Sequence, residues 1–198
     1  SVQHNVPAWA IFGMFFIVVP IAGHMIRERE EGSALRLALI PSSVPFVSLG
    51  KVCFYVLVCM TQFFLMLAIG ICLLPMLGLP RLSLGAHPWA LLPVAACISF
   101  NATAYGYFIG SVFRTPNQAL PFGAISVVIL SALGGIWIPT DILPPLVQRI
   151  ALISPLYWAL DSVNQLFLRN LGLAEVTRHM LILTGAGAAL WLFAYLRN

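Results

Sequence analysis

Residues 52–77 read VCFYVLVCMTQFFLMLAIGICLLPML and contain no Asp, Glu, Lys or Arg. A helix needs roughly 20 apolar residues to cross the hydrocarbon core of a bilayer, and this run exceeds that length. Four other stretches lack the same charged residues, at 1–26, 82–113, 115–140 and 179–196. Of the 198 residues, 61% are hydrophobic and 8% are charged, whereas soluble domains have about 25% charged residues. The sequence therefore predicts an integral membrane protein.

The charge-free runs predict an all-α fold, a polytopic transmembrane helical bundle that forms one domain over residues 1–198. Five spans are expected, at about 7–25, 52–77, 89–113, 119–138 and 180–196. The first contains Pro20, which is expected to kink it. The segment 139–177 is too polar to cross the membrane, but its apolar residues recur at helical spacing. We expect two short re-entrant or surface helices there on the outer side, divided at Ser154-Pro155.

The densest charge cluster of the chain is REREEG, at residues 27–32. It opens a segment, 27–51, in which Leu35 and Leu39 recur at helical spacing. This pattern indicates a short amphipathic helix at the membrane surface, and Pro41 is expected to end it.

Three acidic residues, Glu28, Glu30 and Glu31, would lie in the first turn of that helix, where carboxylates suit the positive end of the helix dipole. A rigid, charged helix between two spans can transmit a push from a soluble partner into both spans. The alternative interpretation is that the basic residues of the segment only anchor helix ends at lipid head groups.

Lys and Arg are distributed unevenly between the two sides of the predicted bundle. One side carries six (Arg27, Arg29, Arg36, Lys51, Arg114, Arg197) and the other carries four (Arg81, Arg149, Arg169, Arg178). Four of the six lie in the segment 27–51, and basic residues in short loops favour the cytoplasmic side. We therefore expect the beginning of the chain outside and its C-terminus in the cytoplasm. An exported N-terminus without a signal segment suggests that a further span precedes it.

Three polar residues within the predicted spans, Gln62, Asn101 and Thr103, are candidates for a substrate path. Such groups more often hydrogen-bond a neighbouring helix. No Asp, Glu, Lys or Arg lies in the middle of a predicted span, which argues against a proton-coupled carrier or a voltage sensor. The pattern favours a carrier that is driven from outside the membrane, or one that moves an amphipathic or hydrophobic substrate.

Several classes of site have no motif in this sequence. There is no GxxxxGK[ST] phosphate-binding loop, no HExxH and no CxxC, so neither ATP binding by this chain nor a metal site is predicted. No constellation of catalytic residues is evident. The net charge of +4 is small and scattered, which does not favour nucleic-acid binding.

Four stretches together resemble ABC-2 type permeases, the membrane subunits of bacterial ATP-binding-cassette exporters. They are REREEGSALRLALIPSSVPFVSLGK at 27–51, RTPNQA at 114–119, GGIWIPTDILPP at 134–145 and ISPLYWALDSVNQLFL at 153–168. The resemblance extends from Val6 to about Leu196. Each motif is short, and it is their order and spacing together that carry the resemblance. Family members usually have six spans, so this chain would lack the first.

The resemblance implies a half-transporter in a bacterial inner membrane. It would pair with a second permease copy and rest on a separate ATPase subunit, which would bind ATP and Mg. The segment 27–51 would then couple the two, through Glu28, Glu30, Glu31, Gly32, Leu35, Leu39 and Pro41. Candidates for an outer re-entrant segment or gate are Pro139, Asp141, Pro144, Pro155, Tyr157 and Asp161. The charged residues Asp141, Arg149 and Asp161 are expected to pair with one another or with lipid head groups.

Two other functions stay open at this stage. The chain could be a membrane enzyme or assembly factor without a transport role, or a secondary carrier. An ATPase subunit that copurifies with the protein would distinguish an export permease from both.

Overall fold

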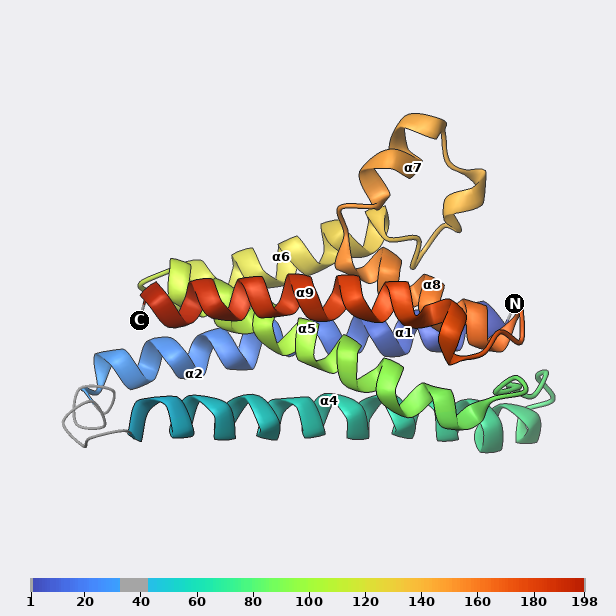
Figure 1. The fold of residues 1–198 in the computed structure, drawn as a ribbon, viewed down its shortest axis with the longest axis horizontal. Helices are drawn as coiled ribbons and strands as arrows, with labels where there is room; N and C mark the ends of the chain where they lie inside the picture. The colour runs from blue at the N-terminus through green and yellow to red at the C-terminus, as the bar shows by residue number, and fades with distance from the viewer. Residues whose placement is uncertain (1, 33–42, 198) are drawn as a thin grey trace.

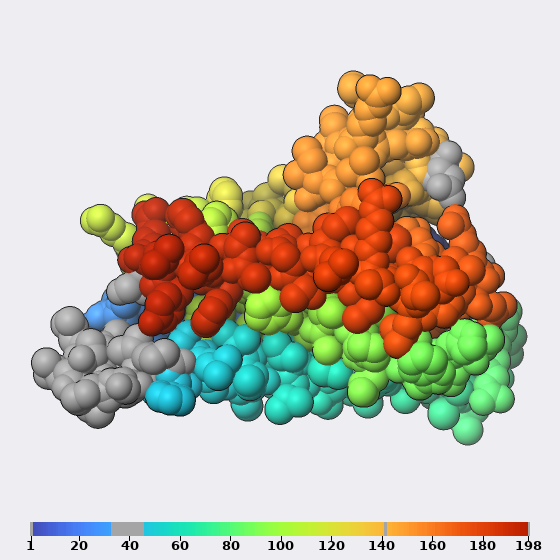
Figure 2. Space-filling view, viewed as in Figure 1, coloured from blue at the N-terminus to red at the C-terminus, as the bar shows by residue number. Residues whose placement is uncertain are grey.

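The computed structural model describes residues 2–32 and 43–197, and within these ranges the chain forms helices and no strand. The helices are α1 (Val2–Phe15), α2 (Val18–Glu30), α4 (Ser43–Met76), α5 (Leu91–Val112), α6 (Pro116–Leu133), α7 (Pro145–Ala151), α8 (Pro155–Phe167) and α9 (Leu173–Arg197), with short 3-10 turns η1 (Pro88–Ala90) and η2 (Thr140–Ile142). The long helices run along the same axis, and the α7 segment projects from one end of the bundle (Figures 1 and 2).

Five helical stretches among the described residues are long and apolar enough to cross a membrane. They are Val2–Glu30, Phe46–Met76, Pro88–Val112, Pro116–Leu133 and Leu173–Arg197. This confirms the expected all-α, polytopic bundle. Successive stretches run in opposite directions, so the chain passes back and forth along the bundle (Figure 1).

The two ends of the bundle carry different segments. One end, called here the Glu28 end, holds the end of α2, the start of α4, the end of α5, the start of α6 and the C-terminus (Figure 1). The opposite end, called the Asp161 end, holds the start of α1, the loop after α4, and the segment from η2 to the start of α9 (Figure 1).

The central helix of the bundle is α5, which contacts α1, α2, α4, α6, α8 and α9. Glycines let its neighbours approach closely. A Cβ atom at Gly110 of α5 would lie 3.2 Å from the Cα atom of Ala22 in α2, and a Cβ atom at Gly187 of α9 would lie 3.1 Å from the Cα atom of Asn101 in α5. Small residues at such contacts allow helix backbones to pack at short range in membranes.

The first span is interrupted at Phe16 and Ile17, between α1 and α2. Pro20 causes the interruption, because it has no N–H to donate to the carbonyl of Phe16 and its ring crowds that carbonyl. The Phe16 carbonyl instead accepts a hydrogen bond from the N–H of Val19, and the N–H of Ile17 bonds to Met14, both with three-residue spacing. The kink expected from the sequence is therefore a break in regular α-helix.

Several helix ends differ from the expected positions. Helix α4 begins at Ser43 rather than near 52, since a proline is tolerated in a first helical turn. Helix α9 begins at Leu173 rather than near 180. Its first turns carry exposed polar residues, which do not oppose helix formation outside the hydrocarbon. Helix α6 ends at Leu133 rather than near 138, because Gly135 has a left-handed φ of 84° that stops the helix.

Candidate functional site

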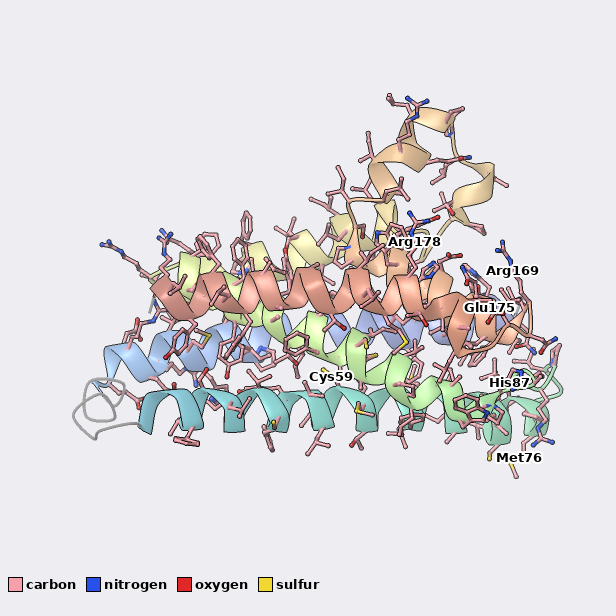
Figure 3. All side chains as sticks on the ribbon, viewed as in Figure 1. Cys59, Met76, His87, Arg169, Glu175 and Arg178 are labelled. Carbon is pink, nitrogen blue, oxygen red and sulfur yellow. The ribbon has the colours of Figure 1, made fainter. Side chains whose placement is uncertain are left out.

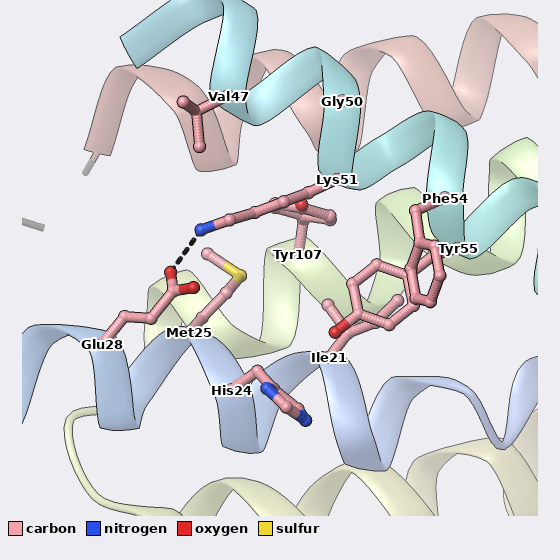
Figure 4. A pocket seen from close by; sticks show the side chains of 10 residues that line it. All are labelled: Ile21, His24, Met25, Glu28, Val47, Gly50, Lys51, Phe54, Tyr55 and Tyr107. Atoms are coloured by element: carbon pink, nitrogen blue, oxygen red, sulfur yellow. Dashed lines mark hydrogen bonds and ion pairs between the residues drawn. The ribbon is translucent and has the colours of Figure 1, made fainter. Parts of the chain in front are cut away.

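The last turn of α2 is joined to α4 by an ion pair at the Glu28 end. The Nζ atom of Lys51 lies 2.5 Å from Oε2 of Glu28, and the two side chains are 33% and 36% exposed. The contact faces inward between the two helices (Figure 4). It connects the helices that flank residues 33–42, which lie outside the described part of the chain.

Arg29 ties the same turn of α2 to α5. Its Nη2 donates a hydrogen bond to the carbonyl oxygen of Gly110. Because α5 ends at Val112, this carbonyl belongs to the last turn, whose carbonyls lack partners within their own helix. A cation at that position also suits the negative end of the helix dipole. The ends of α2, α4 and α5 are thus fastened to one another.

The acidic residues of the cluster do not open a helix, as the sequence suggested. Glu28 and Glu30 lie in the last turn of α2, and Glu31 caps it. The helix continues through them because no breaker precedes Gly32, whose φ of 69° ends it. Arg27 and Arg29 in the same turn suit the negative helix end. The other predicted coupling residues, Leu35, Leu39 and Pro41, lie outside the described residues.

A pocket of about 340 Å³ lies beside the ion pair, between α2, α4 and α5. Glu28 and Lys51 are part of its wall, and the buried Tyr107 of α5 reaches it from the side of the bundle (Figure 4).

At the opposite end, three polar side chains from α8 and α9 meet. The Nε2 atom of His179 lies 2.7 Å from Oδ2 of Asp161. The amide of Gln165 donates to the same carboxylate oxygen at 2.8 Å and lies 3.2 Å from the His179 ring nitrogen. His179 is 7% exposed, so the cluster fastens α8 onto the first turns of α9 from within.

The carboxyl group of Asp161 is perturbed by two opposing effects. Burial alone would raise its pKa, but the hydrogen bond and charge of His179, the amide of Gln165 and the charge of Arg169 outweigh burial and hold the pKa below its ordinary value. Asp161 is therefore ionised under ordinary conditions and stabilises the contact with His179.

An aromatic residue and two cations surround this cluster. The ring centroid of Trp158 lies 5.3 Å from that of His179, and the guanidinium carbon of Arg178 lies 5.8 Å from the centroid of Trp158. Arg169, Glu175 and Arg178 gather at this end of the bundle (Figure 3).

The other gate candidates define the path of the chain at this end. Pro139 and Pro144 directly precede η2 and α7, and Pro155 is the first residue of α8. Asp141 lies in η2. The ring of Tyr157 contacts that of its neighbour Trp158, with centroids 5.4 Å apart.

The sequence left open whether Asp141, Arg149 and Asp161 pair with one another or with lipid head groups, and among the described residues Asp161 does not pair with Arg149. Asp161 bonds to His179 and Gln165 instead, and Arg149 lies exposed on α7. The physical reason is that α7 stands away from the bundle (Figure 1), whereas α8 packs against α9.

Comparison with known proteins shows which family this sequence belongs to. The sequence model of the ABC-2 family transporter protein matches residues 1–196. The chain belongs to the ABC-2 transporter family. This ABC-2 chain is 25% identical over 168 residues to the linearmycin resistance permease protein LnrN of Bacillus subtilis (strain 168). The matched region covers 83% of the chain and 42% of LnrN. It is 27% identical over 198 residues to the inner membrane transport permease YhhJ of Escherichia coli (strain K12), covering 96% of the chain and 52% of YhhJ.

The ABC-2 chain thus spans about half the length of the curated relatives it matches. No solved structure matches it. The family, the permease relatives and the five apolar helical stretches identify a multi-pass membrane transport permease.

The polar residues within the spans of this ABC-2 permease lie at helix contacts. The amide nitrogen of Asn101 donates to the carbonyl of Leu183 in α9 at 2.8 Å. Asn101 and Thr103 are fully buried in one copy of the chain. A Cβ atom at Gly13 in α1 would lie 2.5 Å from the amide nitrogen of Gln62 in α4. Each of these residues therefore packs where two helices meet.

Three residues of the ABC-2 permease with defined contacts were missed at the level of sequence. His179 directly precedes the span expected at about 180–196, Arg29 is one charge of the REREEG cluster, and Tyr107 lies within an expected span without an assigned role. A signal existed only for His179, a titratable residue at the start of an apolar run. The partner of Arg29 and the place of Tyr107 in the pocket wall depend on how the helices pack.

Proposed function

We propose that this permease is the membrane part of an ATP-driven exporter and that an ATP-binding-cassette ATPase subunit docks on its Glu28 end. The observation that carries the proposal is that non-covalent contacts join the end of α2 to two other helices. Glu28 is paired with Lys51 of α4, and Arg29 is bonded to Gly110 of α5. A force applied there would reach three helices together.

Exposed charges surround this fastened end. Arg27, Glu30 and Glu31 point to the surface of the described structure, where a soluble protein can form ion pairs with them. Charged side chains at the rim of an interface set the rate and specificity of association more than its strength. This arrangement supports a docking role for the region around residues 27–32, with Leu35, Leu39 and Pro41 as further proposed contacts.

The energy source would be the partner rather than this chain. The sequence contains no GxxxxGK[ST] loop, so ATP and Mg would be bound by the ATPase. A second permease copy would complete the transporter. The absence of Asp, Glu, Lys and Arg from the middle of the spans favours an amphipathic or hydrophobic substrate.

We further propose a bacterial inner membrane location, with the Glu28 end in the cytoplasm and the Asp161 end outside. The larger share of basic residues lies at or next to the Glu28 end, including Arg27, Arg29, Lys51, Arg114 and Arg197, which fits the positive-inside rule. The relative YhhJ is named an inner membrane transport permease.

Copurification tests the proposal. The permease is expressed together with a candidate ATP-binding-cassette ATPase from the same organism, and the complex is isolated in nanodiscs. We expect the ATPase to stay bound to the wild type and to be lost when Glu30 and Glu31 are both replaced by Lys. Glu175→Lys is the matched control, because Glu175 is also exposed on a helix but lies at the opposite end. A permease that binds no ATPase would contradict the proposal.

A further inference from the structure

The pocket at the Glu28 end has the size and lining of a small-molecule site. Its volume is about 340 Å³, within the range of roughly 300–1,000 Å³ that ligand pockets occupy. Four of the ten lining residues have apolar side chains, Ile21 and Met25 from α2 and Val47 and Phe54 from α4, and five are polar or charged. The exposed surface of the wall is nevertheless mostly apolar. Apolar walls with a few convergent polar groups are the usual composition of such sites.

One polar group in this wall has no partner. Tyr107 of α5 is 6% exposed, and its hydroxyl makes no hydrogen bond with residues 2–32 or 43–197. Buried polar groups are nearly always hydrogen-bonded, so this closed-off hydroxyl, on a residue that lines the pocket, lacks the partner that such a group normally has. Tyr105, on the same helix, shows the contrast, because its hydroxyl donates to Oγ of Ser126 at 2.7 Å.

The charges at the pocket compensate each other. Glu28 and Lys51 both line it, and they face one another at 2.5 Å. A charged ligand would have to compete with this ion pair, whereas an uncharged one would leave it intact. His24 also lines the pocket. With His24 neutral, the lining carries no net charge, which favours a ligand without net charge.

The pocket also reaches the apolar outer surface of α4. Phe54 lines it and is 61% exposed. Its neighbours on that surface include Leu57, which is 63% exposed. Because this helix is a membrane-spanning candidate, the lipid phase can supply the ligand along this wall.

We propose that the pocket between α2, α4 and α5 binds an uncharged amphiphile from the membrane. Its hydroxyl or amide head group bonds to the Tyr107 hydroxyl, and its apolar part lies against Ile21, Met25 and Phe54 (Figure 4). The site lies between α2 and α4, the two helices that flank residues 33–42. An occupant therefore contacts both helices and would affect the distance between them. This proposal requires that the chain lies in a membrane, but it does not require that an ATPase binds to it.

Photolabelling tests the site in the complete permease held in nanodiscs. The probe is a long-chain alcohol with a diazirine in its chain, and labelled residues are mapped by mass spectrometry. We expect label on the pocket residues of α2 and α4. Tyr107→Phe should reduce that label by about five-fold, the effect of one neutral hydrogen bond, while Tyr105→Phe should leave it unchanged.

A second variant tests the cavity without removing a polar group. Gly50 lines the pocket, and a Cβ atom there would meet no described atom within 4 Å, so Gly50→Leu adds a side chain at a position that is open at Cβ. We expect it to abolish labelling in the pocket. Gly185→Leu is the control, since Gly185 on α9 is equally open and lies outside the pocket.

Two outcomes would overturn the assignment. One is equal pocket labelling in the wild type, Tyr107→Phe and Gly50→Leu. The other comes from two further diazirine probes of the same chain length, a fatty acid and an alkylammonium. If these charged probes label the pocket as strongly as the alcohol does, the site does not select against charge. Neither outcome bears on the docking of an ATPase, which the copurification experiment decides separately.

Discussion

The ring of His179 and the carboxylate of Asp161 are in direct contact, with 2.7 Å between Nε2 and Oδ2. The histidine belongs to α9, a membrane-spanning candidate, and the aspartate to α8, which is outside the five candidate stretches. One partly buried polar contact thus fixes the segment at the Asp161 end to the final span.

Replacing Asp161 by Asn tests this contact through its pH dependence. The pKa of Asp161 is lowered in the folded protein, so its stabilisation is present above the ordinary aspartate pKa of about 3.9 and disappears as the pH falls through the lower, folded value. At pH 6 we expect Asp161→Asn to cost about 1 to 2 kcal/mol, the range for a partly exposed charged hydrogen bond.

Thermal unfolding in detergent, followed from pH 6 down through the ordinary aspartate pKa of about 3.9 and below the folded pKa of Asp161, measures this difference. The gap between the wild type and Asp161→Asn should close at the acidic end. Glu30→Gln serves as the control, because Glu30 is an exposed carboxylate at the other end of the bundle. A gap that persists unchanged at low pH would mean that the ionised carboxylate is not what stabilises α8 on α9.

The pair of Glu28 and Lys51 can be measured by a double-mutant cycle with Glu28→Gln and Lys51→Met. Both side chains are about one-third exposed, so solvent screens them and we expect a coupling energy of about 0.5 to 1 kcal/mol. The coupling should shrink at high salt. Thermal midpoints of the four proteins give the value, and additive effects of the two substitutions would show that the ion pair contributes nothing in solution.

Two glycines on α9 provide a test of the close packing between α9 and α5. At Gly187 a Cβ atom would lie 3.1 Å from the Cα atom of Asn101 and 3.0 Å from the ring of Phe100. We expect Gly187→Val to destabilise the protein by about 1 to 3 kcal/mol. Gly185→Val should change stability by less than about 0.5 kcal/mol, because no described atom lies within 4 Å of a Cβ atom there. Similar losses for both variants would contradict the packing of α9.

The proposed orientation predicts opposite labelling of the two ends. Single cysteines are placed at Gln118, in the first turn of α6, and at Arg149 on α7, both exposed. The natural cysteines Cys53, Cys59, Cys72 and Cys97 are first replaced by Ser or Ala. An impermeant maleimide should react with Arg149→Cys in intact cells and with Gln118→Cys only after permeabilisation. Reaction of both positions from one side would exclude the topology.

The number and type of the long helices followed from the sequence because the bilayer imposes a simple constraint. Each crossing needs a long run without charge, and the run at 52–77 meets this condition by itself. Helix ends were harder to predict. Charged residues at a membrane surface neither require nor forbid a helix, so Glu28 and Glu30 could be assigned to the start of one helix when they form the end of another.

The pairings could not be predicted for a different reason. Asp161 was a candidate in the sequence, but its partner His179 lies on the next helix, and nothing in the spacing of the two residues fixes how α8 packs on α9. Tyr107 lies in an apolar run where tyrosine is unremarkable. Its unpaired hydroxyl becomes visible only when the walls of the pocket are known.

The break at Phe16 and Ile17 has a mechanical consequence. Bending there disrupts fewer backbone hydrogen bonds than bending in the continuous α4, because Pro20 has already removed one donor. The two halves also have different main neighbours: α1 lies chiefly on α4 and α8, and α2 on α5 and α6. We therefore expect the two halves of the first span to bend relative to each other at Phe16 and Ile17. A displacement at the Glu28 end would then reach the Asp161 end only in part.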